Sequence, residues 1–412
     1  MARRMAPHRD DIIMITREAP LLTPASVASI QAALATAGVD GWLLYDFRGC
    51  NPIARSMIGL EGMQSRRVFA WIPTRGTPIA ISHAIEQLAW AQWPLAWERR
   101  VYAAWRDLER EVASLVANKR IAMEYSAGDA VPVVDRVPAG MLEMIRATGA
   151  TVVTSAELVS RFFAVWSADG LASHQRAAEQ IARIAHEAFA RAGAAARTPK
   201  PLAEHEVMEW MRSEFAACGL ETDHGPNVSA TENAANPHYE PSAGAPRFIR
   251  EGDAILIDLW ATEPGGIYAD QTWMASVGAP SARLMQVWTC VRDARDAALA
   301  LLAERINGGL PVRGAEADDA ARAVIEKAGF GQYFTHRTGH SIDARALHGS
   351  GPNLDNLETR EERLLIPGVG FSVEPGVYIP GELGVRSEVN CWIGDGALLV
   401  TPRTIQRDLI IV

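Results

Sequence analysis

Apolar residues in the N-terminal part of the chain alternate between helical and extended spacing. Helical spacing predicts amphipathic helices at residues 26–38 and 107–119. Short apolar runs predict strands at residues 41–47, 67–73, 78–82 and 120–125, with a hairpin where residues 74–77 separate two of them. Residues 141–155 repeat the order of helix, glycine and strand. Strands that alternate with helices in this way are typical of a small α/β domain.

The alternation breaks at residues 161–172, and we expect a domain boundary there, between residues 1–165 and 166–412. Beyond it, helical spacing predicts long helices at residues 173–193, 202–219, 282–306 and 314–329. Ser281 is the expected N-cap of the third, and Gly329 the expected end of the fourth. Short strands and turns fill the rest, so the second domain is predicted to be of the α+β class.

Composition excludes several classes of protein. The 412 residues are 48% apolar and 22% charged, as in an ordinary globular chain. A net charge of −9 without a basic cluster disfavours a nucleic-acid partner. The N-terminus has no apolar run suited to a signal peptide, and no apolar stretch is long enough to span a membrane. The cysteines form no CxxC pair, which favours reduced thiols in the cytoplasm: Cys50, Cys218, Cys290 and Cys391.

Five potential metal ligands lie in the C-terminal half, each within a short distinctive sequence motif. They are Asp258 in LIDLW, Asp270 in YADQTW, His340 in HRTGH, Glu374 in SVEPGVY and Glu388 in VRSEVN. Taken singly, each has an ordinary interpretation as a turn, cap, strand or structural residue. The ordered set instead favours a site for two divalent cations, which can activate water at neutral pH.

Electrostatics supports this interpretation. Asp258 ends an apolar run that predicts a buried strand, and the turn at residues 263–266 would bring Asp270 beside it in a hairpin. Two carboxylates about 4 Å apart repel each other by about 4 kcal/mol at an effective dielectric constant of about 20. Adding Glu374 and Glu388 makes such a cluster unstable without cations, and two divalent ions would neutralise it. Oxygen and nitrogen donors without a thiolate suit Mn²⁺, Fe²⁺, Co²⁺ or Zn²⁺, of which we expect Mn²⁺.

The five motifs resemble those of the creatinase, aminopeptidase P and prolidase metallopeptidases, which form the pita-bread family. The resemblance covers nearly the whole chain. It implies a creatinase-like α/β N-terminal domain followed by an α+β pita-bread catalytic domain. It also implies that Asp258 chelates one metal, that Asp270 and Glu388 bridge both, and that His340 and Glu374 bind the second. Glu374 would further act as general base and then general acid.

The same resemblance implies roles for residues around the metals. His238 would line the substrate pocket, His336 would also contact substrate, and His348 would hydrogen-bond the scissile carbonyl; His238 and His348 would thereby take part in catalysis. Arg386 would orient the ligand network or contact substrate. Arg360 would bind the carboxylate of a dipeptide, for which the planar guanidinium is suited, although a surface ion pair in LETREER is the alternative.

The chain departs from the family pattern after His340. The spacing from His340 to His348 is one residue longer than is usual, as is that from Asp258 to Asp270. Asp343 stands where the family often has glycine, which leaves open an additional functional acid near the site.

The sequence therefore predicts a dinuclear metallopeptidase that cleaves the Xaa-Pro bond of dipeptides, as a cytoplasmic homodimer acting on small peptides. Three alternatives remain at this point. They are an aminopeptidase P acting on longer Xaa-Pro peptides, a metal-dependent lyase on the same fold, and a binding protein without catalysis. The presence of all five ligands argues against the last.

Overall fold

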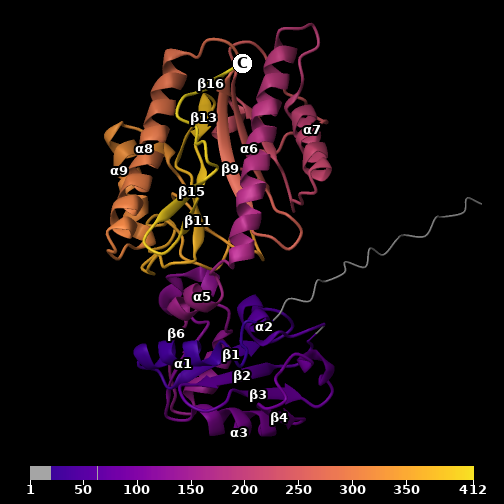
Figure 1. The fold of residues 1–412 in the computed structure, drawn as a ribbon, viewed down its shortest axis with the longest axis vertical. Helices are drawn as coiled ribbons and strands as arrows, with labels where there is room; N and C mark the ends of the chain where they lie inside the picture. The colour runs from indigo at the N-terminus through magenta and orange to yellow at the C-terminus, as the bar shows by residue number, and fades with distance from the viewer. Residues whose placement is uncertain (1–19, 63) are drawn as a thin grey trace, which may run out of the picture.

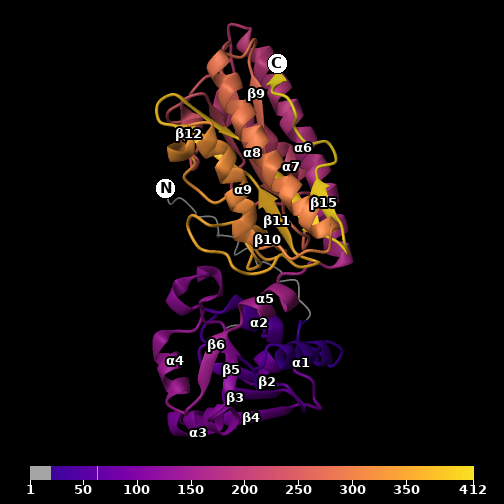
Figure 2. The same cartoon turned by 90° about the vertical axis from the view of Figure 1, so that its left-hand side faces the viewer.

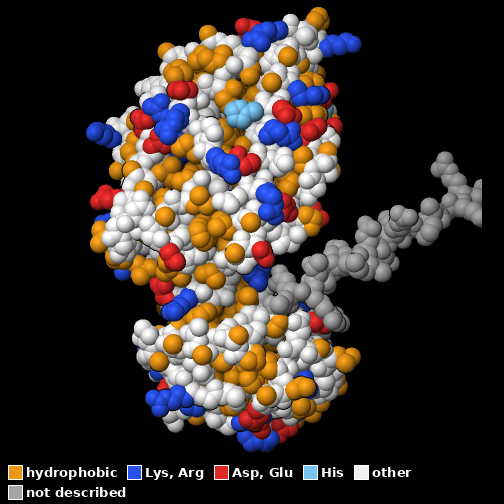
Figure 3. Space-filling view, viewed as in Figure 1, with side chains coloured by type: hydrophobic (Ala, Val, Ile, Leu, Met, Phe, Trp, Pro, Cys, Tyr) orange, Lys and Arg blue, Asp and Glu red, His pale blue; other side chains and the backbone are white. Residues whose placement is uncertain are grey.

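The computed structural model describes residues 20–62 and 64–412. The expectation that no signal peptide is present concerns residues 1–19, which lie outside this range. Figures 1 and 2 show two bodies, a smaller one built from the N-terminal residues and a larger one built from the rest. The space-filling view shows a narrower waist where they meet (Figure 3). In the described part of the chain, no helix is both long and apolar enough to cross a membrane.

The N-terminal body contains a six-stranded mixed sheet in the order β4-β3-β2-β1-β5-β6. Its strands are β1 Gly41–Asp46, β2 Val68–Pro73, β3 Ile79–His83, β4 Glu98–Tyr102, β5 Arg120–Met123 and β6 Thr151–Thr154. Its helices are α1 Val27–Thr36, α2 Pro52–Ile58, α3 Trp105–Val116, α4 Ala139–Arg146 and α5 Ala156–Phe162. Strands β2 and β3 pair antiparallel, which confirms the predicted hairpin.

The sequence pattern identified α1 but not α2. Gly38 follows α1 with a φ of 64°, a left-handed conformation that suits glycine at a helix end. Helix α2 has only seven residues, too few for a clear apolar period. Its signal was chemical instead: the Asn51 side chain accepts the N–H of Ala54, and Pro52 occupies the first turn.

The larger body contains two four-stranded sheets and a separate hairpin. One sheet has the order β16-β9-β8-β7 and the other β10-β11-β14-β15, while β12 pairs with β13. The first sheet comprises β7 Asn227–Ala230, β8 Ala254–Ala261, β9 Ala269–Ser276 and β16 Ile410–Ile411. The others are β10 Ser341–Ile342, β11 Gly370–Val373, β12 Gly376–Ile379, β13 Leu383–Arg386, β14 Val389–Ile393 and β15 Leu398–Thr401.

Two pairs of helices cover these sheets from opposite sides (Figures 1 and 2). The pair α6 Ala168–Ala196 and α7 Glu204–Ala217 shares a hydrophobic core with β7, β8 and β9. The pair α8 Ala282–Asn307 and α9 Gly314–Lys327 shares a core with the second sheet and the hairpin. Single 3₁₀ turns connect other segments: η1 Leu88–Trp90, η2 Ala127–Asp129, η3 Pro132–Val134, η4 Asn233–Ala235 and η5 Gly331–Tyr333. An α/β body followed by an α+β body is the predicted fold class.

Helix caps explain where two of these helices start. Ser281 caps α8 as predicted, because its side chain accepts the N–H of Leu284. Helix α6 begins earlier than predicted. Its N-cap is Ser167, whose side chain accepts the N–H of Gly170, so the first turn precedes the strongly periodic segment.

Candidate metal centre

Two of the predicted ligands lie on neighbouring strands of the first sheet. Strands β8 and β9 pair antiparallel, with Asp258 opposite Thr272 and Trp260 opposite Asp270. Residues that face each other across a strand pair share a side of the sheet, as do alternate residues of one strand. Asp258 and Asp270 therefore point to the same side, which confirms the predicted hairpin.

The second sheet supplies the other three predicted ligands at strand ends. His340 precedes β10, Glu374 follows β11 and Glu388 precedes β14. A close backbone approach sets this arrangement, because a Cβ on Gly339 would lie 2.0 Å from the carbonyl oxygen of Ser372. The N–H of Ser372 donates to the His340 carbonyl over 2.8 Å. Glycine before the histidine thus lets His340 lie beside Glu374.

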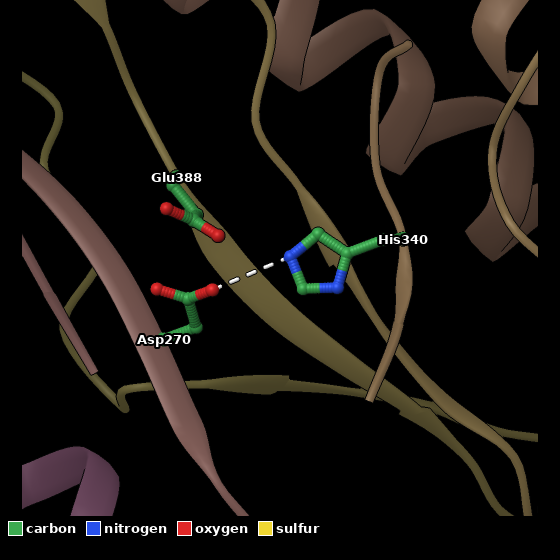
Figure 4. A group of neighbouring side chains, drawn as sticks. All are labelled: Asp270, His340 and Glu388. Atoms are coloured by element: carbon green, nitrogen blue, oxygen red, sulfur yellow. Dashed lines mark ion pairs between the residues drawn. The ribbon is translucent and has the colours of Figure 1, made fainter. Parts of the chain in front are cut away.

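The two groups of residues meet between the sheets. Ligand atoms of Asp270, His340 and Glu388 all lie within 4.8 Å of one another, and all three residues are buried. Figure 4 shows the carboxylates and the imidazole pointing toward one another from separate strands and a loop. His340 Nε2 lies 3.3 Å from Asp270 Oδ2 and 3.4 Å from Glu374 Oε1. One imidazole nitrogen therefore faces carboxylates from both sheets.

The protonation of His340 follows from its other nitrogen. His340 Nδ1 lies 3.0 Å from the carbonyl oxygen of Ser341, which can only accept, so Nδ1 carries the proton. Burial lowers the pKa of His340, which favours the neutral ring, although the charge on Glu374 opposes this effect. Nε2 then presents a lone pair to two carboxylates. Metal-binding histidines commonly have this arrangement, with the second nitrogen donating to a carbonyl.

The carboxylates also carry unsatisfied oxygens. Asp270 Oδ1 and Glu388 Oε1 are buried and have no hydrogen-bond partner among the described residues. Burial raises the pKa of both groups well above the usual range, and neighbouring carboxylates add to the rise. Buried polar atoms are rarely left without a partner. Two buried carboxylates that each keep an oxygen without a partner, grouped with an imidazole lone pair, fit a divalent cation, so this donor set suits the expected metal.

Arg386 and Thr272 connect the remaining carboxylates. Arg386 Nη2 forms an ion pair with Asp258 Oδ2, and Arg386 Nε donates to Thr272 Oγ1 over 2.8 Å. The Thr272 hydroxyl in turn donates to Glu388 Oε2 over 2.9 Å. Sequence reasoning did not identify Thr272, although its place two residues after Asp270 in YADQTW puts it on the same face of β9.

Tyr378 is a second residue that the sequence did not reveal. Arg386 Nη1 donates to the Tyr378 hydroxyl over 3.1 Å, and this hydroxyl lies 2.8 Å from His336 Nε2. His336 Nδ1 donates to the carbonyl of Arg337, so Nε2 accepts from the tyrosine. Both nitrogens of His336 therefore bind within the protein, and His336 fixes Tyr378 beside Arg386.

Glu374 differs from the neighbouring carboxylates because several groups stabilise its charge. Burial alone would raise the pKa of Glu374, but the surrounding histidines in their protonated forms, together with Arg386, lower the pKa below its usual value. The Ser372 hydroxyl also donates to Glu374 Oε1 over 3.0 Å. Glu374 is thus an ionised carboxylate at neutral pH, able to accept a proton.

The three other predicted site residues occupy different surroundings. His348 is exposed, and its ring lies edge-on to His340 with the centroids 4.2 Å apart. The neighbouring His340, followed by partial burial, lowers the pKa of His348 to about 4. His238 is exposed after η4, and its N–H donates to Asn236. The Arg360 side chain is 78% exposed and pairs with Glu362 over 2.5 Å. The structure therefore brings His348 to the centre and leaves His238 and Arg360 at the surface.

Comparison with known proteins agrees with this geometry. The model of a family described as metallopeptidase family M24 matches residues 174–395, more than half of the chain. The chain is 28% identical over 396 residues to a Mycobacterium tuberculosis protein named "Probable dipeptidase PepE", covering 94% of this chain and 96% of the relative. It is 35% identical over 161 residues to a Xaa-Pro dipeptidase of Lactobacillus helveticus, covering 39% and 40% of the two chains.

A solved structure shows the same similarity in three dimensions. The crystal structure of dipeptidase PepE from Mycobacterium ulcerans superposes with a TM-score of 0.72 at 25% identity. The superposition covers 94% of this chain and 97% of that one, so both bodies take part.

Proposed function

Because the chain belongs to metallopeptidase family M24, we propose that it hydrolyses the Xaa-Pro bond of dipeptides. The observation that carries the proposal is the buried meeting of Asp270, His340 and Glu388, with unsatisfied oxygens on both carboxylates. Similarity over nearly the full length to proteins named dipeptidase supports a short substrate. Similarity of part of the chain to a Xaa-Pro dipeptidase supports proline after the cleaved bond.

The proposal assigns two divalent ions, Mn²⁺ by preference, to five residues: Asp258, Asp270, His340, Glu374 and Glu388. The unsatisfied oxygens of Asp270 and Glu388 support bridging roles for these two. The neutral His340 with Nε2 free to bind supports its role as the nitrogen ligand. When bound, such ions lower the pKa of water and polarise a carbonyl.

The surrounding side chains supply proton transfer and orientation. Glu374, held ionised, accepts a proton from the attacking water and returns it to the proline nitrogen as that nitrogen leaves. His348 donates a hydrogen bond to the oxygen of the scissile carbonyl, where negative charge develops. His238 closes the pocket when substrate binds, which requires its exposed segment to move inward. Arg386, His336 and Tyr378 keep the carboxylates in place.

Arg360 is proposed to bind the C-terminal carboxylate of the dipeptide. It would leave Glu362 to do so, and exchanging one exposed carboxylate for another costs little, because surface ion pairs contribute about 0–1 kcal/mol. This exchange is the feature that favours a dipeptidase over an aminopeptidase P, whose substrates extend beyond the proline.

We further propose a homodimer in the cytoplasm. Apolar side chains lie open on the visible face of the N-terminal body (Figure 3). The exposed apolar side chains of the whole N-terminal body include Ile85, Leu88 and Leu95, which are 67%, 92% and 104% exposed. Exposed apolar patches commonly mark protein contacts. Free cysteines support a reducing compartment: Cys50, Cys218, Cys290 and Cys391.

A substrate panel tests the proposed reaction. Purified protein with Mn²⁺ is incubated separately with an Xaa-Pro dipeptide, an Xaa-Pro-Yaa tripeptide, an Xaa-Ala dipeptide and a β-substituted carboxylic acid, and products are identified by mass spectrometry. We expect the highest kcat/KM for the Xaa-Pro dipeptide, with the two free amino acids as products. Preference for the tripeptide would establish an aminopeptidase instead. Elimination products from a β-substituted carboxylic acid, without peptide hydrolysis, would establish a lyase.

A further inference from the structure

His348 belongs to the segment of residues 343–351, whose backbone is hydrogen-bonded to the side chain of its own first residue, Asp343. We call this segment the His348 loop. Asp343 is buried and 3% exposed. Its Oδ1 accepts the N–H groups of Arg345 and Ala346 over 2.8 and 3.0 Å, and its Oδ2 accepts the N–H of Ser350 over 3.2 Å. Asp343 thus ties the start of the loop to its end, as aspartates do in tight turns.

Asp343 stands at the departure from the family pattern after His340. Its carboxylate satisfies backbone donors at both ends of the loop. The three hydrogen bonds that the Asp343 carboxylate accepts come from within the loop, as a structural role requires.

The catalytic body fixes the far end of the loop. Arg363 is buried, and its guanidinium donates to the carbonyls of Ser350 and Gly351, each over 2.7 Å. The N–H of Gly351 donates to the Ser341 hydroxyl over 3.0 Å, next to His340. The end of the loop is therefore connected to the metal centre.

The N-terminal body fixes the outer side of the loop through Arg345. Arg345 Nε donates to the Ser56 hydroxyl of α2 over 3.0 Å. The Arg345 guanidinium also lies over the ring of Phe163, 4.6 Å from its centroid, at the end of α5. Figures 1 and 2 show α2 and α5 on the side of the small body that faces the larger one. Arg345 lies three positions before His348, so the contact acts on the same short loop.

We propose that Arg345 is a positioning residue, which uses Ser56 and Phe163 of the N-terminal body to hold His348 over the metal centre. The proposal rests on the proposed function for the role of His348, and it gives the N-terminal body a part in catalysis within one chain. A loop tied at both ends by Asp343 and Arg363 moves as a unit. A change in the orientation of the two bodies is then transmitted through Arg345 to the imidazole. Small displacements of a catalytic group are costly, since about 1 Å can reduce the rate a hundredfold.

Steady-state kinetics of the full-length manganese enzyme tests the proposal. Arg345→Ala is expected to lower kcat about tenfold or more with KM within about twofold, because His348 acts on the charge that develops in the transition state. Arg345→Lys, which can still donate to Ser56, is expected to recover part of the rate. Ser56→Ala removes the hydroxyl that accepts from Arg345 and leaves the sequence of the His348 loop unchanged. Arg110→Ala, which removes an exposed arginine of α3, is the matched control.

A double-mutant cycle separates positioning from general loss of structure. In a His348→Ala background, Arg345→Ala is expected to have little further effect on kcat, because two residues that act as a unit are not additive. A full additional tenfold loss in that background would overturn the proposal. So would wild-type kcat in both Arg345→Ala and Ser56→Ala.

The NMR ring resonances of His348 test the positioning role of Arg345 without relying on peptidase activity. In full-length protein with labelled histidine and no added metal, the ring resonances of His348 are identified by their loss in His348→Ala. They are expected to shift in Arg345→Ala and Ser56→Ala and to stay in place in Arg110→Ala. Unchanged resonances would overturn the positioning role. If the wild-type protein hydrolyses no peptide, the proposed function fails, and this measurement alone decides the role of Arg345.

Discussion

Arg386 and Asp258 form an ion pair at the edge of a cluster of carboxylates. The guanidinium is 7% exposed and also binds the Thr272 hydroxyl, so the pair is held between the first sheet and the β12–β13 hairpin. Asp270 and Glu388, deeper in the cluster, face His340 and each keep an oxygen without a partner. Arg386 thus offsets part of the negative charge of the cluster, and the unpartnered oxygens of Asp270 and Glu388 leave the rest to metal.

Removing one of the unsatisfied carboxylates should stabilise the metal-free protein. Burial and neighbouring charges raise the pKa of Glu388, so the fold loses stability as the pH rises from the ordinary pKa of a glutamate toward that raised value. We expect Glu388→Gln in chelator to unfold about 2 °C or more above wild type at pH 8. Adding Mn²⁺ should reverse the order, because only wild type gains binding energy. Differential scanning fluorimetry measures both.

A surface glutamate provides the control for that experiment. Glu382 is 42% exposed and pairs with Arg283, so Glu382→Gln should leave both melting temperatures near wild type. Equal metal-induced stabilisation of Glu388→Gln and wild type would show that Glu388 does not bind the ion.

The geometry of Arg386 should matter more than its charge. Arg386 contacts Asp258, Thr272 and Tyr378 from three nitrogens. Lysine keeps the charge but has a single nitrogen, so Arg386→Lys should lower metal affinity or kcat/KM about tenfold to a hundredfold. Isothermal titration with Mn²⁺ and peptide kinetics distinguish the two effects. Arg283→Lys, on the surface, is the matched control. Equal metal affinity and equal kcat/KM in the two variants would show that the geometry of Arg386 does not matter.

Arg360 should affect dipeptides and spare longer peptides. If its guanidinium binds the substrate carboxylate, Arg360→Ala raises KM for the Xaa-Pro dipeptide about fivefold to tenfold. KM for an Xaa-Pro-Yaa tripeptide should change little, because its carboxylate lies one residue further on. Arg176→Ala, another exposed arginine in a surface ion pair, controls for the loss of charge. Equal KM values in wild type and Arg360→Ala would leave Arg360 as a surface residue paired with Glu362.

A buried glutamate in the N-terminal body should make stability depend on pH. Glu124 is fully buried and accepts hydrogen bonds from Trp42, Asn51 and Ser155, at 2.5, 2.8 and 3.1 Å. Burial outweighs these bonds and raises the pKa of Glu124 from 4.5 to about 7. An acid with a raised pKa contributes stability that is complete below pH 4.5 and is lost as the pH rises through 7.

The variant Glu124→Gln isolates this contribution because glutamine does not titrate. Between pH 4.5 and pH 8, wild type should lose about 3 kcal/mol of unfolding free energy relative to the variant. Glutamine also places an NH₂ among donors, so the variant is less stable overall and only the slope is compared. Urea unfolding at several pH values gives that slope. Parallel pH profiles would mean that Glu124 keeps its ordinary pKa.

The sequence predicted those parts of the fold that local patterns control. Long helices such as α8 and paired strands such as β8 and β9 follow from apolar periodicity, cap residues and turns, which act over a few positions. The order of the predicted helices and strands, together with the motifs around the predicted ligands, indicated an α/β N-terminal domain followed by an α+β pita-bread catalytic domain. Helix α2 was too short for periodicity to detect, and the start of α6 depended on the single cap Ser167.

The sequence identified residues that meet at the candidate site but not their partners. The five predicted ligands stood out because each occupied a distinctive motif. Thr272 gains its role only when the first sheet packs against the β12–β13 hairpin and contacts Arg386. Tyr378 contacts Arg386 within that hairpin, but its other partner, His336, comes from the loop before β10. The exposure of Arg360 and the turn closed by Asp343 also depend on how loops fold over the second sheet.

Hydrolysis by protein of known metal content tests the central claim most directly. The protein is stripped with chelator, reloaded with increasing Mn²⁺, and assayed on an Xaa-Pro dipeptide while bound metal is counted by mass spectrometry of the same samples. We predict no turnover without metal, and release of both amino acids that rises as about two ions bind per chain. Asp270→Asn should bind less metal and remain inactive. Undiminished hydrolysis by the stripped protein, or full metal binding by Asp270→Asn, would contradict the account.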